Sequence, residues 1–181
     1  MFYQFSHIPP EVDTELLERI WNKCYNQSES ALVGHHQTEV FIASRPWSQD
    51  TELQKMVDIS KEILNRSGFQ VLDELDPRDD IHIEFHNYYS DGQKIQSNFY
   101  RHCDDEGWIS ECVTLIYYLE KSPTLDGGNL FLYPNKDDTN PIICEIQTGK
   151  MLMIHGSVYH EIENLTGTGN RRCIVIQLRR S

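Results

Sequence analysis

The spacing of apolar side chains predicts two helices near the start of the chain. One runs over residues 10 to about 26, with acidic residues early, where a helix N-terminus favours them. The other runs over residues 50–66 and ends before Gly68, a residue typical of helix ends. Their apolar positions recur three or four residues apart: Val12, Leu16, Leu17, Ile20 and Cys24, then Leu53, Met56, Val57, Ile59, Ile63 and Leu64. Between the two helices, residues 39–43 are typical of a strand.

After Gly68 the pattern becomes that of strands, with short β-branched or aromatic runs separated by turn residues. The predicted strands are residues 69–74, 80–89, 97–103, 111–120, 129–133, 142–146, 150–155, 158–163 and 172–179. Helices followed by many strands predict an antiparallel β-sandwich or open barrel backed by helices on one sheet. We expect a single domain over residues 1–181, with a helical support at about 10–67 and a β-barrel at about 69–180.

Composition narrows the range of partners. The 16 basic and 28 acidic residues give a formal net charge of −12, which disfavours binding to a nucleic-acid backbone. No apolar run is long enough to cross a bilayer, and the N-terminal residues do not resemble a signal peptide. The five cysteines are an odd number without a CxxC pair, which favours reduced thiols. We therefore expect a cytoplasmic protein with neither a membrane nor a nucleic acid as partner.

Candidate metal ligands stand on two predicted strands. His102 and Asp104 flank Cys103 at the end of one, and residues i and i+2 of a strand point to the same side. His160 lies on a later strand. Two imidazoles and one carboxylate leave one face of a metal open, an arrangement typical of non-haem iron(II) sites that bind O2 and a bidentate co-substrate. We predict that these three residues bind the metal.

Other histidines compete for these roles. His155 directly follows the apolar run 151–154 and is the alternative to His160 as third ligand. His82 and Glu84 form a second ligand-like pair, which we interpret as the polar outer face of the first barrel strand. His7 and the adjacent pair His35-His36 are interpreted as solvated loop residues, and Cys103 as a packed thiol rather than a nucleophile.

Further motifs follow in a fixed order after His102. Residues 112–121 read Cys-Val-Thr-Leu-Ile-Tyr-Tyr-Leu-Glu-Lys, residues 127–134 join a Gly-Gly turn to Tyr-Pro, and residues 149–154 form a Gly-x-apolar strand. His160-Glu161-Ile162 and Arg172 complete the series. Over residues 85–178 the chain resembles the 2-oxoglutarate/Fe(II)-dependent dioxygenases, specifically the prolyl 4-hydroxylase-like branch.

The resemblance implies a double-stranded β-helix (jelly-roll) fold and a hydroxylase that uses Fe(II), 2-oxoglutarate and O2. By the same resemblance, the catalytic iron ligands are His102, Asp104 and His160. The residues that bind 2-oxoglutarate are Arg172, which pairs with the distal carboxylate, Tyr118, which donates a hydrogen bond to it, and Tyr89, which lines the pocket with Ile83 and Phe85. Arg171 is the alternative to Arg172, because both stand at the edge of the predicted loop 163–170.

The resemblance favours a prolyl residue in a peptide or protein as the substrate. A free amino acid or biosynthetic small molecule is the alternative, and a catalytically inactive, metal-binding β-barrel module is an alternative of another class. Residues 34–47 and the loop after Tyr89 are expected to flank the entrance, because loops on a rigid scaffold carry specificity.

Overall fold

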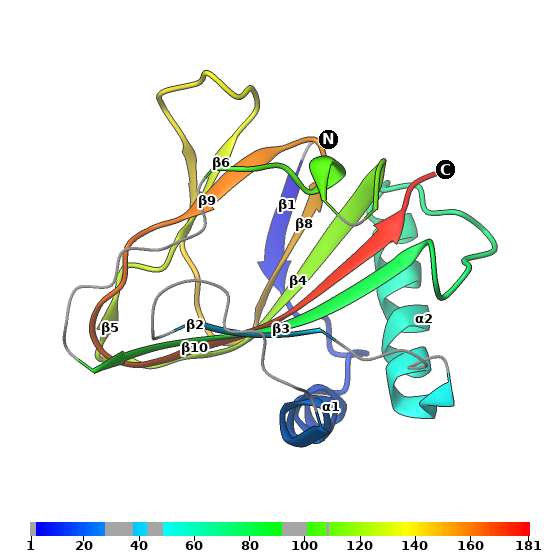
Figure 1. Ribbon diagram of the computed structural model, residues 1–181, viewed down its shortest axis with the longest axis horizontal. Helices are drawn as coiled ribbons and strands as arrows, with labels where there is room; N and C mark the ends of the chain where they lie inside the picture. The colour runs from blue at the N-terminus through cyan, green and yellow to red at the C-terminus, as the bar shows by residue number, and fades with distance from the viewer. Residues whose placement is uncertain (1–2, 28–37, 43–48, 92–100, 108) are drawn as a thin grey trace.

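A computed structural model gives the arrangement of the elements (Figure 1). It describes residues 3–27, 38–42, 49–91, 101–107 and 109–181, and all structural statements below refer to these residues. The helices are α1 (Thr14–Gln27) and α2 (Thr51–Arg66), with a 3-10 turn η2 (Asp104–Glu106). The strands are β1 (Tyr3–His7), β2 (Thr38–Ile42), β3 (Ile81–Asp91), β4 (Cys112–Lys121), β5 (Leu125–Asp126), β6 (Leu130–Tyr133), β7 (Ile142–Cys144), β8 (Lys150–His155), β9 (Tyr159–Ile162) and β10 (Thr166–Arg179).

The strands form two antiparallel sheets. The larger has the order β1-β8-β4-β10-β3-β2, with β5 paired to the start of β10, and the smaller has the order β7-β6-β9. In Figure 1 the smaller sheet and the helices lie on opposite sides of the larger sheet. The chain thus has a mostly β, jelly-roll architecture in which the space between the two sheets can hold a site.

The helices cover the outer face of the larger sheet. Asp50 begins α2, and its carboxylate accepts hydrogen bonds from the backbone N–H groups of Glu52 and Leu53 at 3.0 and 3.3 Å. Trp21 of α1 packs edge-on against Phe85 of β3, with ring centroids 5.9 Å apart. Trp21 and Phe85 belong to one apolar cluster that joins both helices to β3, β4, β8 and β10.

A second apolar cluster lies on the inner face of the same sheet, where Tyr118, Ile116 and Val175 pack towards Leu130 and Leu132 of β6. The central strands are therefore buried on both faces. Because of this, burial alone does not tell which side of a strand faces the site, a point that decides several assignments below.

Most of the predicted elements are confirmed: both helices, the strand at β2, and strands near β3, β4 and β6–β10. Two differ. Residues 69–74 contribute only an isolated bridge from Val71 to Arg180, and β10 begins at Thr166, inside the predicted loop 163–170, because it pairs there with β5. Strand β1 was not predicted. Of the predicted strand 97–103, residues 97–100 lie outside the described residues, and His102 forms an isolated bridge instead.

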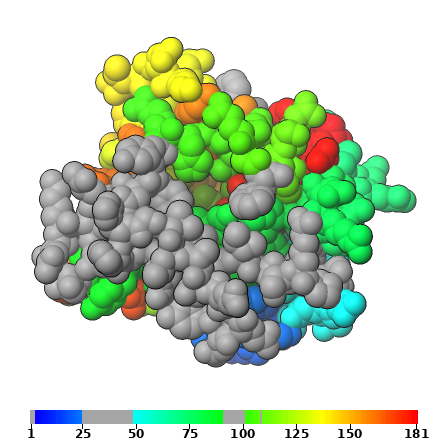
Figure 2. Space-filling model, viewed as in Figure 1, coloured from blue at the N-terminus to red at the C-terminus, as the bar shows by residue number. Residues whose placement is uncertain are grey.

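The surface in the orientation of Figure 1 is shown in Figure 2, where the connection between β6 and β7 projects at the top, away from α2.

Among the described residues, no helix combines the length and apolar character needed to span a lipid bilayer.

Candidate metal centre and interior pocket

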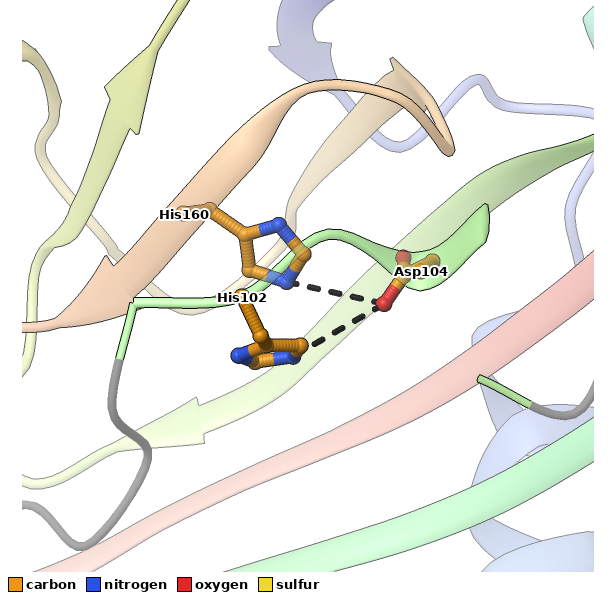
Figure 3. A group of neighbouring side chains, drawn as sticks. All are labelled: His102, Asp104 and His160. Carbon is orange, nitrogen blue, oxygen red and sulfur yellow. Dashed lines mark ion pairs between the residues drawn. The ribbon is translucent and has the colours of Figure 1, made fainter. Parts of the chain in front are cut away.

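Three predicted ligands come together at one end of the space between the sheets. The ligand atoms of His102, Asp104 and His160 all lie within 4.8 Å of one another. Asp104 Oδ1 is 3.8 Å from His102 Nε2 and 3.7 Å from His160 Nε2 (Figure 3). The side chains of Asp104 and His160 are buried, while that of His102 is 41% exposed, so His102 stands at the mouth of the site.

Backbone pairing sets the positions of the two histidines. His102 and His160 exchange two backbone hydrogen bonds, of 3.1 and 2.8 Å, which bring their rings to a centroid distance of 4.4 Å. The Nδ1–H of His160 donates to the carbonyl oxygen of Val158 at 3.0 Å. In the neutral imidazole this bond places the proton on Nδ1, and Nε2 is turned towards Asp104, which is the tautomer that a metal ligand requires.

Asp104 is held from two sides. It begins η2, and its Oδ2 accepts a hydrogen bond from the hydroxyl of Thr114 on β4. The next residue, Asp105, donates its backbone N–H to the carbonyl of Gly156 and accepts from the backbone N–H of Cys112 at 2.8 Å. Asp104 thus keeps Oδ1 directed towards the imidazoles while its second oxygen is bound to the sheet.

An interior pocket connects the three ligands to the inner face of the larger sheet. It is lined by side chains of β3, β4, β6, β9 and β10 together with the ligands: Glu84, His86, Tyr88, His102, Asp104, Thr114, Ile116, Leu130, His160, Ile162, Arg171, Cys173, Val175 and Gln177. Its floor is strand β10, whose alternate residues Arg171, Cys173, Val175 and Gln177 all face it.

Among the described residues that line this pocket, Arg171 is the one arginine or lysine. Its side chain is 1% exposed, and its guanidinium lies 4.7 Å from the ring centroid of Tyr88 and 5.3 Å from that of Tyr118. Within the described part of the chain, Arg171 Nε and Nη1 and the Tyr118 hydroxyl are buried without a hydrogen-bond partner. Burial raises the pKa of Tyr118, more than the charge of Arg171 lowers it, so the hydroxyl keeps its proton and can donate.

Arg172, in contrast, points to the other face of the sheet. Its Nε donates to Glu120 at 2.6 Å, its two Nη atoms donate to Glu18 of α1, and its guanidinium lies over the ring of Trp21. The expectation that Arg172 lines the pocket is therefore corrected. Because β10 is continuous strand from Thr166 onwards, adjacent arginines point to opposite faces, and Arg171 is the one that faces inwards.

Tyr89 is corrected for the same reason. It is 48% exposed, and Ile83 and Phe85, which share its side of β3, pack against the helices. The opposite side of β3 faces the pocket, and Tyr88 occupies the place expected for Tyr89. The assumption that the apolar side of the first barrel strand is the interior side is wrong, because here the helices bury the apolar side and the pocket takes the polar one.

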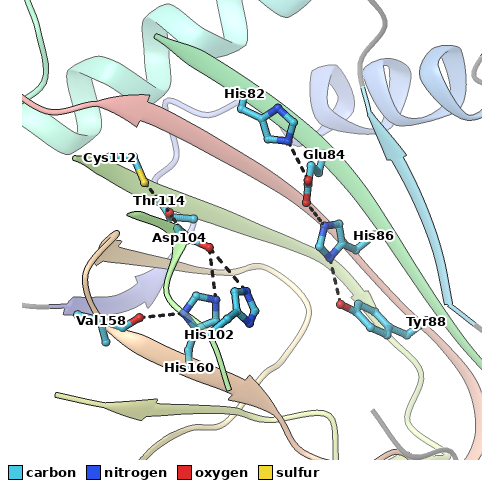
Figure 4. Close-up of polar contacts among 10 residues, drawn as sticks. All are labelled: His82, Glu84, His86, Tyr88, His102, Asp104, Cys112, Thr114, Val158 and His160. Carbon is cyan, nitrogen blue, oxygen red and sulfur yellow. Dashed lines mark hydrogen bonds and ion pairs between the residues drawn. The ribbon is translucent and has the colours of Figure 1, made fainter. Parts of the chain in front are cut away.

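The interpretation of His82 and Glu84 as the polar outer face of the strand is also wrong. Glu84 is inside the pocket, where its two oxygens accept hydrogen bonds from His82 Nε2 at 2.8 Å and His86 Nε2 at 2.6 Å (Figure 4). His86 Nδ1 is 3.0 Å from the Tyr88 hydroxyl. Burial raises the pKa of Glu84, but the bonds and charges of the two histidines outweigh it, and the net pKa lies below its ordinary range.

The remaining candidates lie elsewhere. His155 stacks on Phe69, with centroids 5.0 Å apart, and is not among the clustered ligands. His7 Nε2 contacts Lys150 Nζ at 2.8 Å. His35, His36 and the segments expected to flank the entrance, apart from β2, lie outside the described residues. Burial is the largest cause of a raised pKa for Cys103, which therefore stays a thiol.

The residues fit the metal and co-substrate that the sequence predicts. Two imidazoles and a carboxylate are donors that Fe(II) accepts. The unpartnered N–H groups of Arg171 and the hydroxyl of Tyr118 need an acceptor. A carboxylate supplies acceptor oxygens together with a negative charge that balances the positive guanidinium. Thr114, Tyr88 and Gln177 also line the pocket but were not predicted from the sequence. The available signal was that each stands an even number of residues from another pocket-lining residue of its strand, namely Ile116, Glu84 and Val175.

Comparison with known families identifies the class. Residues 83–179, more than half of the chain, match the model of the 2OG-Fe(II) oxygenase superfamily. The chain belongs to this family, and it is a 2-oxoglutarate- and Fe(II)-dependent oxygenase with a His102-Asp104-His160 triad that fits the iron site. This assignment favours an enzyme over an inactive barrel module. The family uses Fe(II), 2-oxoglutarate and O2.

Solved structures with the same fold are remote in sequence. An oxidoreductase of the 2OG-Fe(II) oxygenase family from Burkholderia pseudomallei is 17% identical with a TM-score of 0.68, over 98% of this chain and 86% of that one. A Pseudomonas putida prolyl-4-hydroxylase is 17% identical with a TM-score of 0.59, over 98% and 92%. A Trichoplax adhaerens prolyl hydroxylase, in complex with a hypoxia inducible factor peptide fragment, is 14% identical with a TM-score of 0.64, over 98% and 83%. No curated protein matches the sequence significantly.

Proposed function

We propose that the protein hydroxylates an unactivated C–H bond of a substrate bound in the interior pocket. The observation that carries the proposal is that one pocket contains both the three predicted metal ligands and Arg171 of β10, a buried arginine whose Nε and Nη1 have no hydrogen-bond partner among the described residues. In this assignment His102, Asp104 and His160 bind Fe(II), while Arg171 and Tyr118 bind the distal carboxylate of 2-oxoglutarate.

Bound iron, 2-oxoglutarate and O2 supply the oxidising chemistry, in which 2-oxoglutarate yields succinate and CO2 and the substrate gains a hydroxyl. The chain's own residues would hold and orient these groups. Val158 and Thr114 fix the ring of His160 and the carboxylate of Asp104. Arg171 neutralises the distal carboxylate in a buried setting where the ion pair is strong. The apolar side chains of Ile116, Leu130 and Val175 exclude water from the space between.

Two substrate classes are considered. A prolyl residue in a peptide or protein is suggested by the motifs shared with the prolyl 4-hydroxylase-like branch. A free amino acid or another small molecule is favoured by a specific observation: the wall of the pocket along β3 is polar and carries the carboxylate of Glu84, which suits a small ligand with several polar groups.

The proposed function is tested by two measurements on one preparation. Addition of 2-oxoglutarate to the Fe(II)-loaded protein without O2 should give a weak visible charge-transfer band. With O2, succinate release should rise above the level without substrate when a panel of proline-containing peptides and free amino acids is added, and the product should contain one additional oxygen atom. Absence of the band and of succinate release would contradict the proposal.

A further inference from the structure

The pocket wall along β3 carries a hydrogen-bonded row of charged and polar side chains that the iron and 2-oxoglutarate sites do not use. His82, Glu84, His86 and Tyr88 alternate along the strand and are linked through consecutive hydrogen bonds (Figure 4). The last three line the pocket, and His82 supports Glu84 from outside the pocket lining. Glu84 is central, because both of its oxygens accept from imidazoles of its own strand. A carboxylate has about four acceptor positions, so two remain after these bonds.

A second acceptor faces the same space from the neighbouring strand. Gln177 lines the pocket, its side chain is 6% exposed, and its Oε1 is buried with no hydrogen-bond partner among the described residues. It pairs across the sheet with His82 on β3 and with Thr114 on β4. Because Thr114 is bonded to Asp104, this unsatisfied acceptor stands beside the metal ligands, where the reacting part of a substrate must lie.

Among the described residues, Glu84 is paired with the imidazoles of His82 and His86 and with no lysine or arginine. Bound metal would balance Asp104, and the distal carboxylate of bound 2-oxoglutarate would balance Arg171. The Nε2 atoms of His82 and His86 contact the two oxygens of Glu84, and His86 Nδ1 contacts the Tyr88 hydroxyl, so the carboxylate is the acidic member of the row. An ionised carboxylate inside a barrel gains less from folding than an apolar side chain at the same position would. Its presence points to a ligand that uses it.

We propose that Glu84, positioned by His82 and His86, and Gln177 form a recognition site for a protonated amine of the substrate. A cationic N–H donor satisfies the buried acceptor of Gln177 and neutralises Glu84, which makes the hydrogen bonds charge-assisted. This inference rests on the proposed function and decides between its two substrate classes: a free amino acid or other small amine fits the site. An internal prolyl residue does not, because its amide nitrogen is uncharged and carries no hydrogen.

The test compares amines with their N-acetyl derivatives. The protein is loaded with Fe(II) and 2-oxoglutarate without O2, and the standard L-amino acids and their N-acetyl forms are titrated by calorimetry. At least one amino acid should bind about tenfold or more tightly than its N-acetyl form. Glu84→Gln should weaken that amino acid about tenfold to a hundredfold and leave the N-acetyl form unchanged, because a charged hydrogen bond is lost. A steric preference would survive the substitution.

Two further variants make the test specific. Gln177→Met removes the second acceptor at similar volume and should weaken the same amino acid about twofold to tenfold. Glu120→Gln removes a carboxylate from the opposite face of the sheet, where it pairs with Arg172, and should leave the affinity unchanged. Each variant is first checked for a cooperative thermal transition, to show that it is folded, and for an unaltered charge-transfer band. If Glu84→Gln does not fold, the Gln177→Met result decides.

The two proposals fail in different ways. If the wild-type protein gives no charge-transfer band, the proposed function is wrong before any amine is added. If the band forms but no amino acid binds better than its N-acetyl form, or the preference persists in both Glu84→Gln and Gln177→Met, the amine site is refuted and the oxygenase assignment stands.

Discussion

Substitution of the adjacent Arg171 and Arg172 of β10 should separate an effect on 2-oxoglutarate binding from an effect on the stability of the fold. Arg171→Met replaces a buried guanidinium, whose Nε and Nη1 are unpartnered, by an apolar side chain of similar length. Two charge-assisted hydrogen bonds to a carboxylate contribute about 1.5 kcal/mol or more each, so affinity for 2-oxoglutarate should fall about a hundredfold or more. The protein without co-substrate should be as stable as the wild type, or more stable by about 1–3 kcal/mol, because a buried charge has been removed.

Arg172→Met should behave in the opposite way. Its ion pairs with Glu120 and Glu18 are partly exposed, at 34% and 41% of the carboxylate side chains, so their loss should destabilise the fold by about 1 kcal/mol. For a chain of this size that lowers the melting temperature by about 2–4 °C. Affinity for 2-oxoglutarate, titrated by the charge-transfer band, should not change. Retention of tight binding in Arg171→Met, together with its loss in Arg172→Met, would refute the assignment.

Two other predictions concern packing and thiol chemistry. A Cβ at Gly156 would lie 2.2 Å from Asp105 Oδ1 and 2.5 Å from Cys112 Sγ. Gly156→Ala should therefore destabilise the protein by about 1–3 kcal/mol, as measured by urea unfolding. Ser157→Ala, at an exposed neighbouring position, should not change the stability. Burial raises the pKa of Cys144 and Cys173 to about 11, so at pH 8 only about one thiol in a thousand is ionised. Iodoacetamide should label both quickly only after unfolding, as mass spectrometry can show; fast labelling of the native protein would contradict their burial.

The helices, the β-rich second half and the metal ligands could be predicted because each depends on local information. An apolar stripe at helical spacing forms a helix wherever it finds a sheet to cover, and His102 and Asp104 are two residues apart. His160 could be paired with them only through the order of the motifs, since the bridge that joins His102 to His160 connects distant parts of the chain.

The choice of strand face could not be predicted by the rule that apolar residues point inwards. On β3 the apolar residues face the helices, and Glu84, His86 and Tyr88 face the pocket, so the rule selects Tyr89 instead of Tyr88. On β10 the strand begins five residues before Arg171, through pairing with a two-residue strand that no pattern marks. When both faces of a sheet are buried, the same alternation of residues is compatible with either face lying towards the site. The packing of the helices on one face decides which it is.

The central claim is that His102, Asp104 and His160 bind one iron atom. The most direct measurement is the visible band of the protein with Fe(II) and 2-oxoglutarate in the absence of O2, recorded with iron content for the wild type, His160→Ala and His155→Ala. The wild type and His155→Ala should bind one iron and give the band, and His160→Ala should lose both. A band that survives in His160→Ala, or disappears in His155→Ala, would contradict the account.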